Sequence, residues 1–476
     1  MTDKNTAPCP NFRKCGGCQL QNLPYSEQLL HKQRQLVSLL GEFCHVNDII
    51  GMDEPTHYRN KVCAALGLDR QRHIISGIYQ TGSHSIIPVD ECMIEDKISD
   101  SIIVDIRNML RGFKIQAFDE RSGTGWLRHV LVRRGFQSGQ VMVVLVAVSP
   151  IFKLQKPFLK KLTELHPEIT TVVLNVNDRF GPVVLGSREK VLLGDGYIED
   201  SLLGLRFRIS PRSFYQINPV QTERLYSIAI EMAGLTGKEL VLDAYCGVGT
   251  IGLCAAGKAG QALGVELNRD AVKDAIINAK LNGIKNCWFA AGDAGKYMED
   301  MSTGGKRPDV VFMDPPRSGS SPQFLSSLLR AAPKRIVYIS CGPDSLRRDL
   351  DVLVSGGYRV SRIQPVDMFP YTNHVETVVL LSKLNTKQHI EVELNLDELD
   401  LTSAESKATY DEIKAYVLEK HGLKVSSLYI SQVKRKCGLD VGQNYNLSKK
   451  EDAKVPQCPP EKEAAIMDAL KHFQMI

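Results

Sequence analysis

Cys341 is the first residue whose type and position could do chemistry. It follows the apolar run RIVYIS and precedes a Gly–Pro break in the text RIVYISCGPDS. A helix starting in the next segment, PDSLRRDL, would bring its positive end near the sulfur and could lower the pKa of the thiol. A free cysteine, however, is often a small buried apolar residue. The residues alone leave both interpretations open.

Glu376 is the second candidate. It opens the apolar run of TNHVETVVLL, where a carboxylate could be a general base in a partly dry site or a surface group. We interpret its neighbour His374 as a hydrogen-bonded structural histidine.

A thiolate and a base together suit substitution at carbon 5 of uracil, which is a poor nucleophile. Addition of a thiolate to carbon 6 turns carbon 5 into an enolate-like centre that can attack a methyl sulfonium. A base then removes the carbon 5 proton and the thiolate leaves. Cys341 and Glu376 are the candidates for these two roles, and donors on the uracil oxygens would stabilise the developing charge.

The text LDAYCGVGTIGL has the pattern of a strand, a glycine-rich turn and a helix, which lets the backbone approach a ligand closely. Glu266 ends the next apolar run, in GVELNRD, where it could accept hydrogen bonds from ribose hydroxyls. Asp293 ends the third run, in AAGDA. This order fits a methyltransferase pocket. A nicotinamide-binding fold is the competitor, because GVGTIG also satisfies G-x-G-x-x-G, and the glycines alone do not separate the two.

Asp314 begins DPPRSG at the end of the fourth apolar run. The two prolines stiffen the loop and hold Asp314 at the carboxyl end of a strand, where substrates bind. In methyltransferases that act on amino groups an aromatic residue follows the prolines and stacks on the base. Here Arg317 follows them, which argues against methylation of an exocyclic amine.

A cysteine-rich knuckle, CPNFRKCGGC, stands near the start of the chain. Cys9, Cys15 and Cys18, with two glycines in a tight loop, are improbable as core residues. The chain has 12 cysteines, and in a cytosolic protein we do not expect them to form disulfides. Thiolates in this arrangement suit zinc or an iron–sulfur cluster, and the spacing does not choose between them.

These residues need a scaffold that brings the ends of several apolar runs together. From Gln221 on, short apolar runs alternate with helical patterns, which predicts an α/β, doubly wound, Rossmann-like domain. With the motifs described above and the family resemblance given below, we expect a class I methyltransferase domain over residues 213–384. The last two runs, in SRIQPVDMFPYTNHVETVVLLSKL, predict two antiparallel strands. Ligands should bind at the carboxyl ends of the parallel strands.

Three further regions are expected around this domain. Residues 1–50 hold the knuckle and a helix over 26–43, and residues 51–212 form a central β-rich, RNA-binding domain with a mixed, mostly antiparallel sheet that includes LRFRIS. Residues 385–476 form a small helical C-terminal module. Its helix over 403–422, glycine turn and Ser-capped basic helix are compatible with a helix-turn-helix, and the alternative is a helical appendage with a solvated charged face.

Bulk properties restrict the class of protein. The net charge of +5 permits a nucleic-acid partner without arguing for one. The longest apolar run, residues 141–148, is far shorter than the roughly 18 residues that a membrane helix needs. The N-terminus has no apolar signal region. We expect a cytoplasmic protein with no membrane contact and no evident protein partner, and a monomer.

Taken together, the motifs resemble the iron–sulfur RNA uracil-5-methyltransferases, a family with a ribosomal branch and a tRNA-modifying cousin. The resemblance covers residues 9 to about 383. The motifs that carry it are C-P-x4-C-G-G-C, SFYQIN, DAYCGVGTIG, GVE, DPPRSG, SCGP and HVET.

The resemblance implies S-adenosylmethionine as cofactor and 5-methyluridine as product. It assigns Cys341 as the nucleophile that forms a covalent adduct with carbon 6, and Glu376 as the general base. Phe214, in SFYQIN, resembles the aromatic residue beside the target uracil, and Arg59, in HYRNKV, a basic residue on the RNA-facing side. The contacts expected for the cofactor are Gln216, Tyr245, Glu266 and Asp314, with Gly247 and Gly249 shaping the turn and Asp293 near the adenine.

The resemblance also implies a [4Fe–4S] cluster. Cys9, Cys15 and Cys18 match three of its ligands, and Cys92, in IIPVDECMIED, matches the distant fourth. The remaining cysteines are structural or unassigned.

The RNA partner follows from the same resemblance. The iron–sulfur cysteines belong with the ribosomal branch, so 23S rRNA is the expected substrate, with tRNA as the alternative. Many ribosomal members carry a small β-barrel domain called TRAM, which we expect to be absent because the cluster motif begins at Cys9. Basic text such as WLRHVLVRR could supply phosphate contacts, and the target uridine should be an unpaired one that swings out of its stack. A non-catalytic iron–sulfur RNA-binding protein is a further alternative, but it would be expected to lack Cys341 or Glu376.

Overall fold

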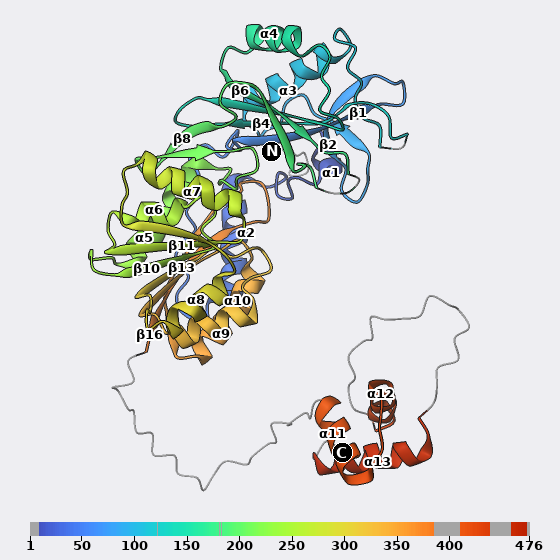
Figure 1. Cartoon of the computed structure of the whole chain (residues 1–476), viewed down its shortest axis with the longest axis vertical. Coiled ribbons are helices and arrows are strands. Elements are labelled where there is room, and N and C mark those ends of the chain that lie inside the picture. Colours follow the sequence, from blue (N-terminus) through green and yellow to red (C-terminus); the bar gives the residue numbers. More distant parts are fainter. Residues whose placement is uncertain are drawn as a thin grey trace. The chain divides into compact units, whose positions relative to one another are not determined.

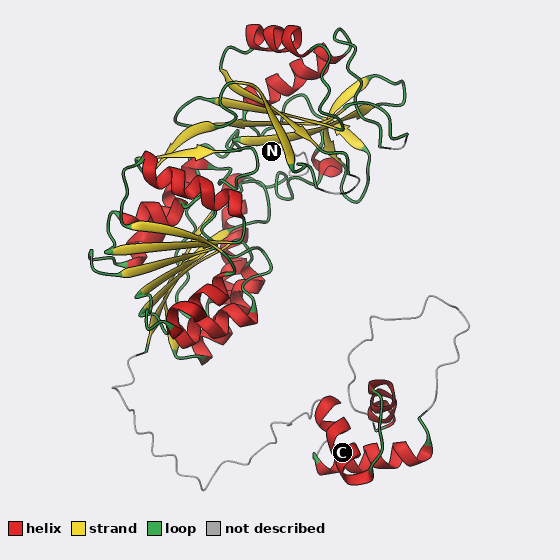
Figure 2. Cartoon of the chain, viewed as in Figure 1, coloured by secondary structure: helices red, strands yellow, loops and turns green. Residues whose placement is uncertain are grey.

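The chain divides into two compact units, residues 1–387 and 388–476. The computed structural model describes residues 9–120, 122–179, 181, 183–384, 410–437 and 458–473. Within its described residues the first unit contains two seven-stranded sheets and one two-stranded ribbon, and the second contains helices (Figures 1 and 2).

The sheet nearer the C-terminal end of the first unit has the predicted doubly wound α/β topology, with strand order β12-β11-β10-β13-β14-β16-β15. Its first five strands are parallel, and β16 is antiparallel to both of its neighbours. The strands are β10 (Leu240–Ala244), β11 (Gln261–Glu266), β12 (Cys287–Ala291), β13 (Val310–Met313), β14 (Arg335–Ser340), β15 (Tyr358–Val366) and β16 (Glu376–Lys383).

Helices cover both faces of this sheet (Figure 2). One apolar core joins the sheet to α5–α7, and the other joins it to α2 and α8–α10. Burial on both faces explains why a strand such as β13 is apolar at every position. Asn268, Asp293 and Ser321 cap three of the helices through their side chains. The helices are α2 (Tyr25–Leu40), α5 (Pro219–Ala233), α6 (Thr250–Ala256), α7 (Arg269–Leu281), α8 (Ala294–Thr303), α9 (Pro322–Ala331) and α10 (Pro343–Ser355).

The second large sheet is mixed and mostly antiparallel, as predicted, with strand order β3-β2-β1-β4-β5-β6-β7 and one parallel pair, β5 and β6. Its strands are β1 (Lys61–Leu68), β2 (Ile74–Tyr79), β3 (Ile86–Pro88), β4 (Leu127–Arg134), β5 (Val141–Ala147), β6 (Ile169–Val176) and β7 (Arg188–Leu193). Two helices that the sequence did not lead us to expect, α3 (Lys97–Leu110) and α4 (Gln155–Leu165), pack against it. Asp96 starts α3 by accepting a hydrogen bond from the backbone N–H of Ser99.

The text LRFRIS lies outside the central sheet, contrary to our expectation. It forms β9 (Leu205–Ile209), which, among the residues that the structure describes, pairs with β8 (Ile198–Leu202) in a separate two-stranded ribbon. The backbone N–H of Arg208 donates to Asn278 Oδ1 on α7, at 2.7 Å, and the N–H of Arg206 donates to Asn282 Oδ1. These two asparagine side chains accept backbone N–H groups of β9, a strand that we had expected to belong to the central sheet.

The N-terminal segment joins the methyltransferase sheet. After the short α1 (Phe12–Cys15), α2 packs in the same core as α10. Val46 and Ile50 then form isolated parallel bridges with Ile363 and Val366, at the open edge of β15. The predicted domain bounds of 1–50, 51–212, 213–384 and 385–476 stay predictions.

The second unit has an apolar core shared by α11 (Tyr410–His421), α12 (Ser427–Lys436) and α13 (Pro460–His472). Ser426 caps α12, and Lys436 in its basic last turn pairs with Glu463 at 2.7 Å. The start of the helix predicted over 403–422 lies outside the described residues, and the helix-turn-helix stays a prediction. In the described part of the chain, no helix is long and apolar enough to cross a membrane.

Candidate active site

A cavity of about 910 Å³ opens where the carboxyl edge of the methyltransferase sheet faces β1 of the central sheet. Most of the residues that the sequence singled out line it. They are Arg59, Phe214, Gln216, Tyr245, Gly247, Glu266, Asp314, Cys341 and Glu376.

Strand topology explains why residues far apart in sequence meet here. Tyr245, Asp314 and Cys341 each follow a parallel strand directly, and parallel strands end at the same sheet edge. Glu376 begins β16, which runs the opposite way, so its first residue lies at that same edge. The pairing of Ser340 with Thr377 in the β14–β16 ladder places Cys341 and Glu376 next in register.

Glu376 is buried, and its Oε2 atom has no hydrogen-bond partner among the residues that the structure describes. Burial raises the pKa of this carboxyl, and the nearby Asp314 raises it further, whereas Arg317 opposes the shift. The pKa of Asp314 is also raised by burial. The two carboxyls lie in one weakly solvated region, where the uncharged forms are favoured and each carboxylate binds a proton more tightly than it would in water.

The thiol of Cys341 is not activated in the way that we predicted. Burial raises its pKa to about 11, and the carboxylates of Glu376 and Asp314 add to the shift, while Arg317 lowers it. Helix α10 does begin just after Cys341, at Pro343. Its positive end is outweighed by desolvation and by the two acids.

The glycine-rich turn after β10 is held by Glu266. One carboxylate oxygen accepts the backbone N–H of Gly247 at 3.2 Å, and the other accepts that of Asn268 at 2.8 Å. Tyr245 has a φ of 66°, a left-handed value that is unusual for a residue with a side chain. Gly249 has a φ of 84°, and a Cβ there would lie 2.7 Å from the ring of Phe289.

Two residues predicted to bind the cofactor do not line this cavity as it stands. Gly249 lies at the start of α6, where it packs against Phe289. Asp293 caps α8, and its Oδ1 accepts the backbone N–H of Lys296 at 2.9 Å.

The wall formed by β1 carries positive charge. Phe214 leaves 66% of its surface exposed beside this wall. Lys61 also lines the cavity, and burial and the nearby Arg133 lower its pKa to about 8. We did not single out Lys61 from the sequence. Its signal is alternation, because Arg59, Lys61 and Cys63 occupy every second position and all face the cavity.

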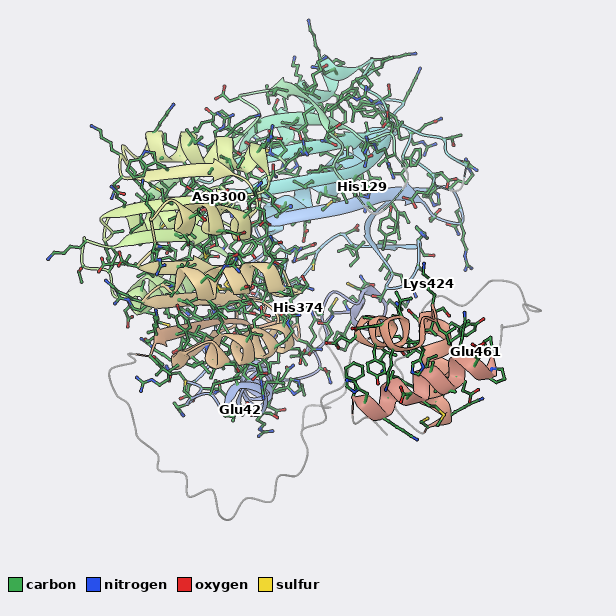
Figure 3. The ribbon with its side chains drawn as sticks, turned by 60° about the horizontal axis from the view of Figure 1, so that its bottom comes forward. Glu42, His129, Asp300, His374, Lys424 and Glu461 are labelled. Carbon is green, nitrogen blue, oxygen red and sulfur yellow. The ribbon has the colours of Figure 1, made fainter. Side chains whose placement is uncertain are left out.

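His374 lines the same cavity and is half-buried (Figure 3). Burial lowers its pKa, and the charges of Arg317 and Lys32 lower it further, which favours the neutral form of the ring. Its ring meets that of Phe369 edge to face, with the centroids 6.2 Å apart. The expectation that His374 is a hydrogen-bonded structural histidine stays a prediction.

The cysteine knuckle is half-buried and partly organised. The backbone N–H of Gly17 points at the sulfur of Cys15, and the side-chain amide of Gln21 at that of Cys18, each at 3.3 Å. Cys18 and Cys92 pack against the same small apolar cluster. Among the described residues, however, no set of three or more His, Cys, Asp or Glu side chains is grouped closely enough to hold a metal ion.

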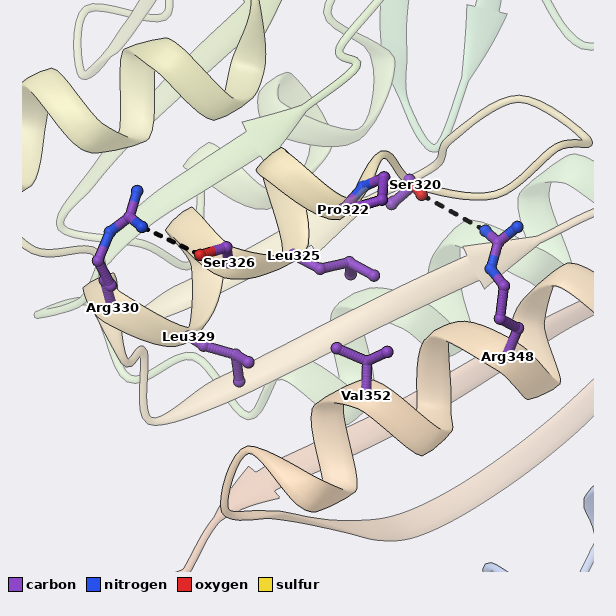
Figure 4. Close-up of a pocket in the computed structure, with 8 residues that line it drawn as sticks. All are labelled: Ser320, Pro322, Leu325, Ser326, Leu329, Arg330, Arg348 and Val352. Carbon is purple, nitrogen blue, oxygen red and sulfur yellow. Dashed lines mark hydrogen bonds between the residues drawn. The ribbon is translucent and has the colours of Figure 1, made fainter. Parts of the chain in front are cut away.

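A second cavity, of about 470 Å³, lies between α9 and α10 (Figure 4). Arg330 donates to Ser326 Oγ within α9, and Arg348 of α10 donates to the carbonyl of Ser320. This cavity contains none of the predicted site residues. Its lining residues are Ser320, Pro322, Leu325, Ser326, Leu329, Arg330, Arg348 and Val352.

A doubly wound sheet with a glycine-rich turn and acidic residues at its carboxyl edge is shared by S-adenosylmethionine-dependent methyltransferases and nicotinamide-binding enzymes, and the match to a methyltransferase family decides between them. Residues 24–384 match the tRNA (uracil-5-)-methyltransferase family, and the chain belongs to this family of RNA methyltransferases. The nicotinamide-binding and non-catalytic alternatives are thereby excluded.

Relatives and a solved structure agree with this assignment. The chain is 44% identical over 388 residues to an uncharacterized RNA methyltransferase of Halalkalibacterium halodurans, covering 80% of this chain and 84% of the relative. It is 43% identical over 390 residues to one of Clostridium acetobutylicum, covering 80% and 85%. The Pyrococcus abyssi tRNA (uracil-54, C5)-methyltransferase, solved with S-adenosyl-L-homocysteine, is 28% identical with a TM-score of 0.65, covering 77% of this chain and 86% of that one.

Proposed function

We propose that this enzyme converts uridine to 5-methyluridine in RNA through a covalent bond between Cys341 and carbon 6 of the uracil. The observation that carries the proposal is the register of β14 and β16, which sets a thiol and a buried carboxyl side by side in one cavity. Neither a purely structural cysteine nor a surface glutamate requires this arrangement.

The residues divide the reaction into two halves. Cys341 loses its proton to water, its sulfur bonds to carbon 6, and the electron pair of the C5–C6 bond moves toward the carbonyl at carbon 4. When bound, S-adenosylmethionine would supply the electrophilic methyl group for carbon 5, with S-adenosylhomocysteine as the leaving group. Glu376 then takes the carbon 5 proton, the C5–C6 double bond re-forms, and the C–S bond breaks to return the thiolate.

The cavity edge fits the proposed cofactor. Carboxylates of Glu266 and Asp314 face it, and the turn at Gly247 leaves backbone space, since a Cβ there would meet no atom within 4 Å. We assign the cofactor contacts to Gln216, Tyr245, Gly247, Glu266 and Asp314, which line the cavity. Gly249 and Asp293, the other two predicted contacts, lie outside its lining, and their roles at the cofactor stay predictions.

The test is to trap the adduct on RNA that carries 5-fluorouridine, with S-adenosylmethionine present. Fluorine does not leave as a proton, so the wild-type enzyme should remain covalently attached to methylated RNA under denaturing electrophoresis. Cys341→Ala should form no adduct. Cys63→Ala is the matched control, because Cys63 lines the same cavity. This variant should still form the adduct through Cys341. Normal methylation by Cys341→Ala would overturn the mechanism.

We propose 23S rRNA as the substrate, because the cysteine motif resembles that of the ribosomal branch. Transfer RNA is the second candidate, supported by the likeness to the Pyrococcus abyssi enzyme. In either RNA, Phe214 would lie beside the flipped uracil, and Arg59 and Lys61 would meet the backbone phosphates. Mapping 5-methyluridine in both RNAs from cells with and without this protein separates the two.

We further propose that Cys9, Cys15, Cys18 and Cys92 hold a [4Fe–4S] cluster. The donor set fits, because four free thiols are available and two of them accept N–H···S hydrogen bonds. As thiolate ligands they would cross-link the knuckle to the Cys92 loop. Anaerobically purified protein should contain about four iron and four sulfide ions per chain. If it contains about one zinc ion per chain instead, these cysteines form a zinc site and not a cluster.

A further inference from the structure

The loop between β15 and β16, residues 367–375, leads directly into Glu376, and we call it the base loop. Its residues Phe369, Thr372 and His374 line the active-site cavity. The Oε2 atom of Glu376 has no hydrogen-bond partner among the described residues. The position and direction of this carboxyl therefore depend on the backbone that carries it.

The backbone of the base loop is held at Tyr371 by the N-terminal segment. The carbonyl of Tyr371 accepts the N–H groups of Gln19 and Leu20, at 3.0 and 2.9 Å. Its own N–H donates to Gln28 Oε1 at 2.9 Å. Tyr371 has a φ of 68°, and a residue with a side chain keeps such a conformation only where its surroundings impose it.

A buried ion pair holds the start of the base loop. Lys32 and Asp367 are fully buried, with Nζ and Oδ1 2.6 Å apart. Lys32 also donates to the carbonyl of Phe369 at 3.1 Å, and the hydroxyl of Tyr25 donates to Asp367 Oδ2 at 2.8 Å. Each oxygen of the Asp367 carboxylate therefore has a partner on α2, and a buried pair is stable only when it is completed in this way.

We infer that the clamp segment, residues 19–32, positions the general base, so that Tyr25, Gln28 and Lys32 act on proton removal and not on thiol addition. Cys341 lies at the end of β14, whose place in the sheet is set by β13 and β16. Loosening the clamp should therefore slow one half of the reaction selectively. This inference rests on the proposed function, in which Cys341 and Glu376 act in successive steps.

The first test variant is Tyr25→Phe, which leaves the ring in place and removes the hydroxyl that donates to Asp367 and accepts the backbone N–H of Met52. Tyr358→Phe is the matched control, because Tyr358 lies at the end of β15 away from the base loop and its buried hydroxyl donates at 2.7 Å to the carbonyl of Pro333. Two rates are measured. The first is adduct formation on 5-fluorouridine RNA, and the second is tritium release from ordinary RNA labelled at carbon 5.

Tyr25→Phe should form the adduct at the wild-type rate and release tritium roughly 3- to 30-fold more slowly, because small misplacements of a catalytic group are costly. Labelled methyl should accumulate in a covalent protein–RNA complex. Tyr358→Phe should change neither rate. The double variant Lys32→Met with Asp367→Asn removes the ion pair without leaving a buried charge, and it should show the same split.

Equal slowing of both rates, or no slowing, in Tyr25→Phe and in the double variant would overturn the inference and leave the proposed function standing. If the wild-type enzyme itself forms no adduct, the proposed function fails, and the inference fails with it.

Discussion

The active-site cavity and the cysteine knuckle differ in how complete they are without a ligand. In the cavity, side chains from five strand ends already converge, because the sheet topology forces those ends to one edge. In the knuckle, the described cysteines do not form a group ready for a metal. A site built on strands is fixed by the backbone, whereas a site built from a loop and a distant cysteine needs its ligand to draw the sulfurs together.

The largest expected effect comes from replacing the proposed general base in the cavity. Glu376→Gln should lower turnover by about 10²- to 10⁴-fold, because it removes the proposed general base but leaves the thiol. Methylated covalent complex should accumulate on ordinary RNA, as measured by denaturing electrophoresis. Glu266→Gln serves as the control, since it should raise the KM for the cofactor without trapping the complex. If Glu376→Gln turns over at the wild-type rate without accumulating the complex, another residue is the general base.

The next effect concerns the thiol. Since the pKa of Cys341 is raised to about 11, the thiolate fraction should grow roughly tenfold per pH unit below that value. At saturating RNA, the rate of adduct formation on 5-fluorouridine RNA should therefore climb between pH 7 and 9. A flat profile would show that bound substrate and cofactor have already converted the thiol to a thiolate.

The knuckle should respond differently. We expect Cys18→Ser or Cys92→Ser to lose iron and to lower the apparent Tm by about 5 °C, because metal binding contributes to folding. Thermal unfolding and iron analysis provide the measurement. Cys44→Ser, outside the knuckle, should keep its iron and its Tm. Full iron content in both Cys18→Ser and Cys92→Ser would exclude these two cysteines as ligands.

The smallest effect concerns the RNA-facing wall. Lys61→Met should weaken RNA binding a few-fold and reduce the slope of log affinity against log salt by about 1. Because the pKa of Lys61 is lowered to about 8, the wild-type advantage should fade as the pH rises above that value. Fluorescence anisotropy over a salt series measures it, with the exposed Lys160→Met as control. Equal slopes would remove Lys61 from the interface.

The features that could be predicted from the sequence are those that a local pattern of residues determines. Alternating apolar runs indicated the parallel sheet, and the ends of those runs marked Asp314, Cys341 and Glu376, which the topology brings together. The resemblance extended the same prediction to Phe214 and Gln216.

Three features depended on contacts that no local pattern records. The pair Lys32–Asp367 joins residues 335 positions apart, so the role of α2 under the base loop was not visible. The pKa of Cys341 depends on burial and on two acids from other strands. The alternation Arg59–Lys61–Cys63 puts Lys61 on one face of β1, but that this face borders the cavity depends on how the two large sheets pack.

The place of α2 in the core has a consequence for biosynthesis. Leu36 and Leu40 pack in the same core as Leu346 and Leu350 of α10, which leave the ribosome about 300 residues later. At roughly 5–20 residues per second, translation of that stretch takes about 15–60 s. During this time the α10 side chains of that core have not been made, so the packing around α2 is completed only after α10 has left the ribosome.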